Sequence, residues 1–280
     1  MKNIVVAVDF SGGSIHALKY AIKIANSIGA NIFMIWVDKT FESDSIYSIS
    51  KENYRGEVVR RFDELIEQYR DEFTGGKLDY KLRTGKIYSE VVAFAQAKKA
   101  DLIITGSHGV SGFEEYWIGS NANRIVAHAA CPVITVRNMF IIKEKIKRIV
   151  MPIDNSTTTL GKLEVTLHLA KLLEAEVHIV NIYSTNLKTM HKRVDNFAQK
   201  AKRRFQKENV SCIHEHFYTQ NVTKVVIDYA KSIDADLISI MTEQDNNLST
   251  GIIGPNAQQI VNHSPIPVLS FHSSNVGLTL

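Results

Sequence analysis

The chain has 280 residues, of which 45% are hydrophobic and 22% charged, a composition that excludes an intrinsically disordered protein. The net charge is only +4, and the basic runs at 143–148 and 191–204 have no aromatic platform or groove motif, so we interpret them as solvated surface and expect no nucleic-acid partner. No apolar run is long enough to span a membrane or to form a signal peptide, which predicts a cytoplasmic protein without a membrane partner.

Strand and helix patterns alternate from the first residues onward. Residues 3–9, NIVVAVD, form a β-branched run that predicts a strand buried on both faces. A helix follows, because Ser11 can cap its start, apolar residues recur at helical spacing and Gly29 can end it. Further along, the patterns predict strands at 31–37, 78–84, 101–106 and 132–137, and helices at 56–71, at 87–98 and from 119.

The chain contains this pattern twice. Residues 119–137 align without gaps to 254–272, and eight of these nineteen positions are identical. The offset between the halves falls from 145 residues at the front to 135 at the back, which places ten extra residues of the first half within 38–56. We therefore expect two domains, named copy 1 (residues 1–140) and copy 2 (residues 146–280).

Five strands interleaved with four helices predict an α/β fold in each copy, because parallel neighbours need crossover helices. The expected architecture is two tandem, doubly wound, Rossmann-like domains, each with a five-stranded parallel sheet. Ligands bind such sheets beyond the carboxyl ends of the strands, where the strand order reverses. Asp9, Val37 and Gly106 lie at three such ends in copy 1.

A glycine motif follows the strand at 101–106. Its spacing is Gly106-x2-Gly109-x9-Gly119, and Ser120 opens the next helix. Amide groups at a helix start lack partners and carry partial positive charge, and glycines let a phosphate approach them closely, so the motif predicts a phosphate site. It lacks the lysine of a Walker A loop and does not follow the first strand, as a Rossmann fingerprint does. A flexible loop before a helix is the alternative.

These residues together resemble the universal stress protein family. The strand DLIITG, the glycine motif, the ending ACPVITVR, the opening NIVVAVDFS and Thr84-Gly85 carry the resemblance, which covers both copies. It implies an adenine nucleotide alpha hydrolase-like fold and an ATP-binding stress-response regulator, with Mg²⁺ or Mn²⁺ in support. The implied contacts are Asp9, Phe10 and Ser11 with adenine and ribose, the backbone of Val37 with the adenine edge, Thr105, Gly106, His108 and Gly109 with ribose and the α-phosphate, and Gly119, Ser120, Asn121 and Ala122 with the β- and γ-phosphates.

Copy 2 has lost most of this motif. Met241 and Gln244 stand at the positions of Gly106 and Gly109, and Pro255 follows the one remaining motif glycine. Side chains would block the phosphates and proline lacks an N–H donor, so copy 2 is not expected to bind ATP in the same way. The loss also indicates that Gly106 and Gly109 serve a ligand rather than the backbone.

The resemblance further implies an assembly and leaves alternatives open. Family members pair through their final strands, so the two copies would form a pseudo-dimer within one chain, with a homodimer and an unidentified protein partner as further possibilities. No catalytic residue is assigned. The alternative functions are an interaction module without nucleotide and a weak ATPase in which His108 or a metal-bound water assists. A loop at 11–14, SGGS, is similar to that of PP-loop pyrophosphatases but lacks the acid and serine that should follow it.

Overall fold

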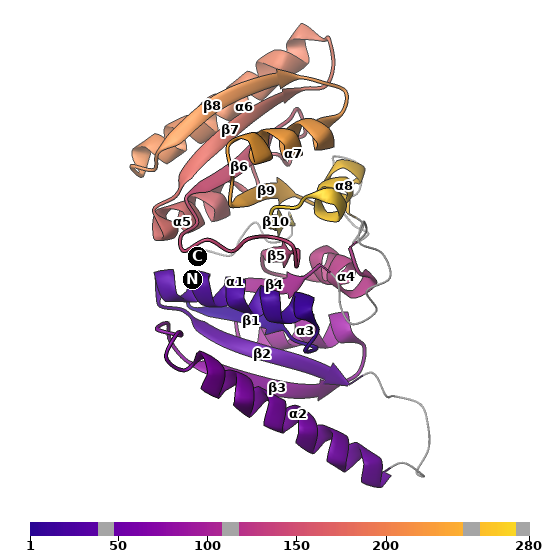
Figure 1. The fold of residues 1–280 in the computed structure, drawn as a ribbon. Helices are drawn as coiled ribbons and strands as arrows, with labels where there is room; N and C mark the ends of the chain where they lie inside the picture. The colour runs from indigo at the N-terminus through magenta and orange to yellow at the C-terminus, as the bar shows by residue number, and fades with distance from the viewer. Residues whose placement is uncertain (39–47, 108–117, 243–252, 273–280) are drawn as a thin grey trace.

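The computed structural model describes residues 1–38, 48–107, 118–242 and 253–272 (Figure 1). The elements of copy 1 are β1 (Asn3–Ala7), α1 (Gly12–Ile28), β2 (Asn31–Asp38), α2 (Ser48–Tyr69), β3 (Leu78–Thr84), α3 (Ile87–Ala97), β4 (Leu102–Gly106), α4 (Ser120–His128) and β5 (Val133–Val136). Those of copy 2 are β6 (Arg148–Ile153), α5 (Leu163–Leu173), β7 (Glu176–Tyr183), α6 (Lys188–Lys207), β8 (Cys212–Tyr218), α7 (Val222–Ser232), β9 (Leu237–Met241), α8 (Pro255–His263) and β10 (Val268–Phe271).

The strands described form one sheet in the order β3-β2-β1-β4-β5-β10-β9-β6-β7-β8. Within each copy neighbouring strands are parallel, and the order reverses between β1 and β4 and between β6 and β9. The doubly wound parallel fold predicted for each copy is confirmed. The two halves meet at an antiparallel pairing of β5 with β10, in which Ile134 lies opposite Leu269. The final strands therefore join the copies within one chain, as the resemblance implies.

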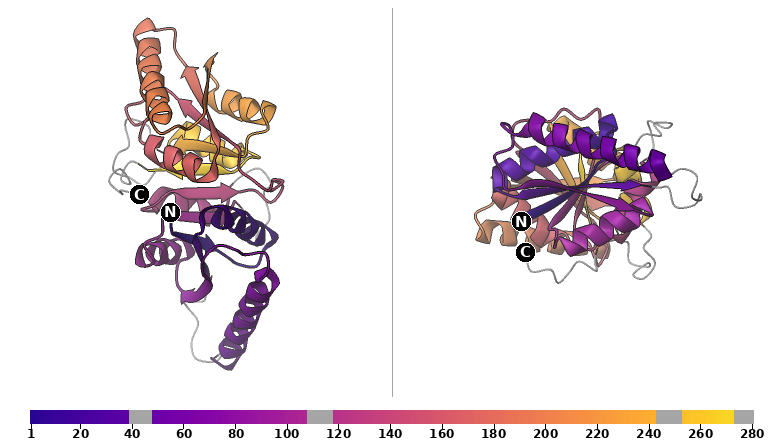
Figure 2. Two further views of the ribbon diagram at one scale, coloured as in Figure 1. Left: turned by 90° about the vertical axis from the view of Figure 1, so that its left-hand side faces the viewer. Right: turned by 90° about the horizontal axis from the view of Figure 1, so that it is seen from below.

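Two helical layers cover the sheet and cross the junction between the copies (Figure 2). Side chains of α1, α2, α5 and α6 share one hydrophobic core, and those of α3, α4, α7 and α8 share the other. Tyr20 of α1 lies at the junction, where its ring meets the edge of Phe140 at 6.1 Å between centroids. Its hydroxyl donates to the carbonyl of Asp236 in copy 2 at 3.4 Å. The two copies are thus packed as one body.

Local signals set the ends of α1 as predicted, but not the start of α2. The Ser11 side chain accepts from the Ser14 amide, and Gly29 ends the helix in the left-handed region with a φ of 68°. The helix α2 begins at Ser48, well before the predicted residue 56, because its first turns carry few apolar residues to reveal a period. Among the helices that the structure describes, none has both the length and the apolar character needed to cross a membrane.

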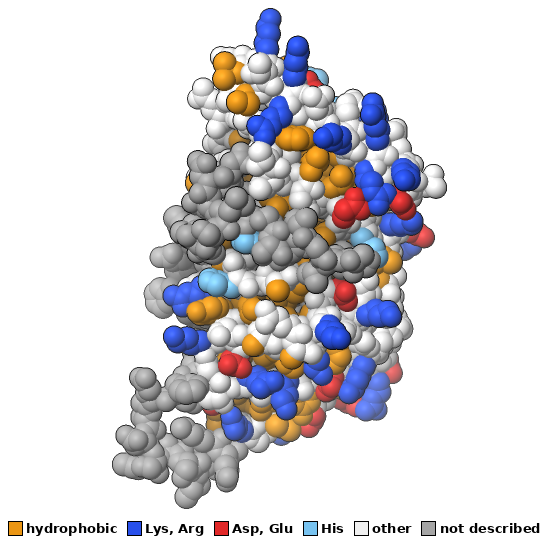
Figure 3. Space-filling view, turned by 180° about the vertical axis from the view of Figure 1, so that it is seen from behind, with side chains coloured by type: hydrophobic (Ala, Val, Ile, Leu, Met, Phe, Trp, Pro, Cys, Tyr) orange, Lys and Arg blue, Asp and Glu red, His pale blue; other side chains and the backbone are white. Residues whose placement is uncertain are grey.

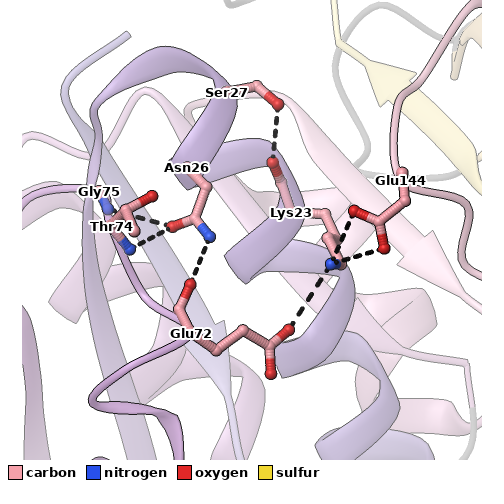
Figure 4. A network of polar contacts seen from close by, with 7 residues as sticks. All are labelled: Lys23, Asn26, Ser27, Glu72, Thr74, Gly75 and Glu144. Carbon is pink, nitrogen blue, oxygen red and sulfur yellow. Dashed lines mark hydrogen bonds and ion pairs between the residues drawn. The ribbon is translucent and has the colours of Figure 1, made fainter.

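Polar contacts attach two connecting segments to the end of α1 (Figure 4). The Asn26 side chain donates to the Glu72 carbonyl at 2.7 Å and accepts from the amides of Thr74 and Gly75. Lys23 lies 3.1 Å from Glu144, in the segment between the copies, and 3.7 Å from Glu72. These partly exposed ion pairs add little stability on their own, so the amide contacts of Asn26 hold the loop.

Candidate functional site

Three strand ends of copy 1 meet at one end of the sheet, here called the carboxyl edge. β1 pairs with both β2 and β4, which brings the residues after each of them together. The amide of Gly119 donates to the Ser107 carbonyl at 2.7 Å, so the start of α4 is attached directly to the end of β4. Most of the predicted site residues therefore gather at this edge. His108 and Gly109 lie outside the described residues.

Asp9 and Ser11 build the turn between β1 and α1. One carboxylate oxygen of Asp9 accepts from the Ser11 amide at 3.0 Å and from its hydroxyl at 2.5 Å. Copy 2 repeats the arrangement, since Asp154 accepts from the amide and hydroxyl of Ser156 at 3.1 and 2.6 Å. A contact present in both copies does not depend on the glycine motif. Asp9 and Ser11 therefore have a structural role, whatever else they contact.

Phe10 adopts a backbone conformation that is rare for a bulky residue, with a φ of 62°. Its ring packs against Phe62 of α2 at 4.8 Å between centroids, and the Arg61 guanidinium lies 4.2 Å above it. Phe62 in turn stacks on Tyr80 of β3 at 4.6 Å. The ring of Phe10 is thus directed toward α2, and this packing holds the strained turn in place.

Val37 has the geometry expected of a residue that reads a ligand through its backbone. The last pair between β1 and β2 is Ala7 with Ile35, and the Ile35 carbonyl accepts from Val8 at 2.9 Å. Backbone groups alternate in direction along a strand, so those of Val37 point to the same side as those of Ile35. Its amide and carbonyl are therefore directed into the space beyond the end of β1.

Gly106 is required by the packing of α1 on β4. A Cβ atom at this position would lie 2.8 Å from the carbonyl carbon and oxygen of Gly13, closer than Cβ atoms come in real structures. These are backbone atoms, so the first turn of α1 would have to move. The sequence comparison predicts that Gly106 serves a ligand and not the backbone. This prediction is wrong about the backbone, because the packing of α1 requires a glycine here. Its neighbour Thr105 is buried, with its hydroxyl 3.3 Å from the Gly106 carbonyl.

Copy 2 tolerates Met241 at the same position because its helix starts later. The residue aligned with Gly12 is Thr157, but α5 begins at Leu163, six residues further on. The Met241 side chain is 8% exposed and lies against the backbone of Gly161, where an added Cβ would be 2.8 Å from the methionine Cε atom. Aligned residues of the two copies therefore lie at different distances from the start of their helices.

Further side chains of copy 2 close its carboxyl edge. The Asn155 amide donates to the sulfur of Met190, in the first turn of α6, at 3.6 Å. Lys162 is buried, and its ammonium donates to the Thr159 carbonyl at 2.7 Å. Burial lowers the pKa of Lys162 to about 8, and the nearby carboxylate of Asp154 opposes this shift. Copy 2 thus places protein atoms where copy 1 has a glycine and a helix start.

The start of α4 offers backbone donors in copy 1. Gly119 is the N-cap residue and makes no side-chain cap, so the first amides, those of Ser120, Asn121 and Ala122, receive no such partner. Copy 2 has one donor fewer, because Pro255 occupies the first helical position. Such a helix start attracts anions. Within the described ranges no group of three or more His, Cys, Asp or Glu residues could hold a metal ion.

Several residues of this edge escaped the sequence analysis. Gly13 is one, since nothing in the sequence shows its contact with Gly106. Asn138 is another, because its side chain lies within 4 Å of the Cβ position of Gly12. The third is Asn262 of α8, which is buried and accepts from the Ile118 amide at 3.3 Å, next to Gly119. Only the internal repeat could have drawn attention to Asn262, since alanine stands at its counterpart in copy 1.

The fold and this edge define a tandem, doubly wound α/β protein. A profile described as the universal stress protein family matches residues 1–137 and 145–272, so the chain belongs to that family. A universal stress protein of Methanocaldococcus jannaschii is 31% identical over 144 residues, which cover 49% of this chain and 82% of that protein. The crystal structure of a universal stress protein from Archaeoglobus fulgidus covers 97% of this chain and 98% of that chain, with a TM-score of 0.74 at 18% identity, a likeness of fold. Another universal stress protein, solved in complex with cAMP, covers 46% of this chain and 98% of that chain, with a TM-score of 0.39 at 16% identity.

Proposed function

We propose that copy 1 binds one ATP molecule and that nucleotide occupancy controls how the protein engages a partner in a stress response. The observation that carries the proposal is the difference between the two carboxyl edges. In copy 1 the helix attached to the end of β4 keeps the Ser120 amide at its first position, and the backbone groups of Val37 point beyond the end of β1. In copy 2 the Met241 side chain and the Pro255 ring replace the corresponding features. The later start of α5 accounts for Met241, so the amide donor that copy 1 keeps and copy 2 loses is the difference that supports a nucleotide in copy 1.

Each part of the nucleotide has a matching group in this proposal. The backbone of Val37 would read the adenine edge, and the α1 turn at Asp9 would lie beside adenine and ribose. Thr105, Gly106, His108 and Gly109 would line the ribose and α-phosphate. The amides from Gly119 to Ala122 would hold the β- and γ-phosphates, because a helix start stabilises negative charge. A bound Mg²⁺ or Mn²⁺ would neutralise part of the phosphate charge.

The sharpest test converts copy 1 to the sequence of copy 2 at a single position. Ser120→Pro removes one donor at the first helical position, where proline is tolerated, so the fold should remain intact. Losing one charge-assisted hydrogen bond should weaken ATP binding about 10- to 100-fold. Isothermal titration should give one ATP per wild-type chain. Ser120→Ala, which keeps the amide, is the matched control and should bind far better than Ser120→Pro.

Two results would overturn the proposal. The first is a wild-type protein that neither binds ATP in titration nor gains melting temperature in its presence. The second is a Ser120→Pro variant that binds as tightly as the wild type, which would place the nucleotide elsewhere. Whether the protein hydrolyses ATP is tested separately by measuring phosphate release. If the His108 side chain assists hydrolysis, His108→Ala should abolish that release.

A further inference from the structure

The charge of the molecule is concentrated on one helix. α6 holds eight Lys and Arg residues against one Asp, a net charge of +7, so the rest of the chain has a net charge of −3. Five of these cations are exposed and recur on the side opposite the buried residues of the helix: Lys188, Lys192, Lys200, Arg203 and Lys207. We call this set the α6 stripe. At 1.5 Å per residue it runs for about 28 Å.

The repeat provides an internal comparison for this helix. Its counterpart α2 has four basic and five acidic residues, and Arg60 pairs with Glu57 and Glu64 along its surface at 2.7 Å each. Within the part of the chain that the structure describes, no ion pair joins any of the stripe cations. In the view from behind, several Lys and Arg side chains project from the top of the molecule, where copy 2 lies, among hydrophobic and uncharged surface (Figure 3). A fold that is stable with a net charge of −1 on α2 does not need +7 on α6.

An aromatic platform lies beside the first turn of α6, where the stripe begins. Tyr218, at the end of β8, is 67% exposed and stacks on the buried ring of Tyr183 at 4.7 Å, with 29° between the planes. His191 of α6 contacts the edge of Tyr218 at 5.4 Å, one residue before Lys192. The Tyr183 hydroxyl donates to the Asp195 carboxylate, which holds the lower ring in place. One face of Tyr218 is therefore covered, and the other is open to solvent.

We propose that the α6 stripe and the Tyr218 platform bind single-stranded nucleic acid. A line of cations matches a phosphate backbone, and an open tyrosine face can stack on a base. Only an unpaired strand offers both, because a duplex keeps its base faces covered. The sequence prediction of no nucleic-acid partner rested on basic runs with no aromatic platform or groove motif beside them. The platform comes from β7, β8 and α6 together, and no single run of sequence contains it.

The stripe predicts a definite salt dependence. Five phosphate contacts on a single strand give a slope of about −3.5 for log K against log salt. Binding should therefore weaken about 100-fold between 50 and 200 mM salt. The probe is a fluorescein-labelled single strand of about 12 nucleotides, within the range of site sizes for such surfaces, and the assay is fluorescence anisotropy with the full chain.

Two sets of variants separate the stripe from the platform. The first replaces Lys192, Lys200 and Arg203 with glutamine, which should reduce the slope to about −1.4. Its control replaces Lys19, Lys81 and Lys145 with glutamine. These lysines are exposed on other parts of the molecule, and their replacement removes the same net charge. The second set is Tyr218→Ala, which should weaken binding about 5- to 150-fold with an unchanged slope, and Tyr218→Phe, which should keep most of the affinity.

Each remaining outcome overturns the proposal. If the control triple variant loses as much affinity as the stripe variant, the binding reflects overall charge and no site exists. Equal binding of a duplex, or Tyr218→Ala with unchanged affinity, would remove the role of stacking. Binding to vesicles of anionic lipid but not to the strand would identify a membrane surface, and equal competition by polyglutamate would identify an acidic protein partner. Circular dichroism and the melting temperature confirm that each variant is folded.

Discussion

The close approach of α1 to β4 predicts that Gly106→Ala destabilises the protein even without nucleotide. The added Cβ would lie 2.8 Å from two backbone atoms of Gly13, which cannot rotate away as a side chain can. Forcing an extra carbon into such a contact costs about 1–3 kcal/mol. In a chain of this size each kcal/mol lowers the melting temperature by about 2–4 °C, so we expect a fall of about 2–12 °C.

The assay is scanning calorimetry of nucleotide-free protein, with Gly56→Ala as the matched control. Gly56 lies in α2 with no atom within 4 Å of its Cβ position, so alanine fits there and favours the helix by about 1 kcal/mol. The same chemical change should therefore have opposite signs at the two positions. If Gly106→Ala leaves the nucleotide-free protein as stable as the wild type and weakens only ATP binding, the backbone argument fails.

Three further predictions concern other parts of the molecule. Lys162 has a pKa lowered to about 8 in the folded state and near 10.4 in the unfolded state, so between these pH values the unfolded chain holds a proton that the folded chain has lost. The free energy of unfolding in urea should therefore rise by up to about 3 kcal/mol over this range, and Lys162→Met should abolish the rise. Asn262→Ala leaves the buried Ile118 amide without its acceptor, so it should lower the free energy of unfolding in urea by about 1–3 kcal/mol. It should also weaken ATP binding in copy 1, although Asn262 belongs to copy 2. The protein should melt in one cooperative transition, and ATP at 100 times its Kd should increase the free energy of unfolding by about 2.7 kcal/mol. Two transitions, of which only one shifts with ATP, would contradict the shared core.

The sequence predicts the fold well because its signals are local or repeated. A β-branched run marks β1, and the cap at Ser11 and the glycine at 29 mark both ends of α1. The repeat then transfers the same order of elements to copy 2. Even the pairing of β5 with β10 follows, through the resemblance rather than through any pattern in the strands themselves.

The candidate site is harder to predict because its contacts join distant segments. The need for Gly106 depends on how closely Gly13 approaches, and the tolerance of Met241 depends on a helix that starts six residues later. A gap-free alignment cannot reveal such a shift, since the residues remain in register while the backbone changes. The contact of Asn262 with Ile118 likewise crosses from one copy to the other.

The divergence of the two copies follows one rule, which is that the sheet is kept and its exposed margins change. Both copies retain five parallel strands, the aspartate turn after the first strand and the tie from the last helix to the strand before it. Copy 1 differs by the Ser120 amide at the first position of α4 and by an α2 with a net charge of −1, whereas copy 2 differs by Pro255 at that position, a filled edge and a strongly basic α6. Because the sheet is continuous, these margins lie on one rigid body, and a nucleotide at one end and an anionic partner at the other could bind without competing for the same surface. Under the two proposals above, the duplication would assign nucleotide binding to copy 1 and anion binding to copy 2, tasks that a single domain would have to combine on one edge.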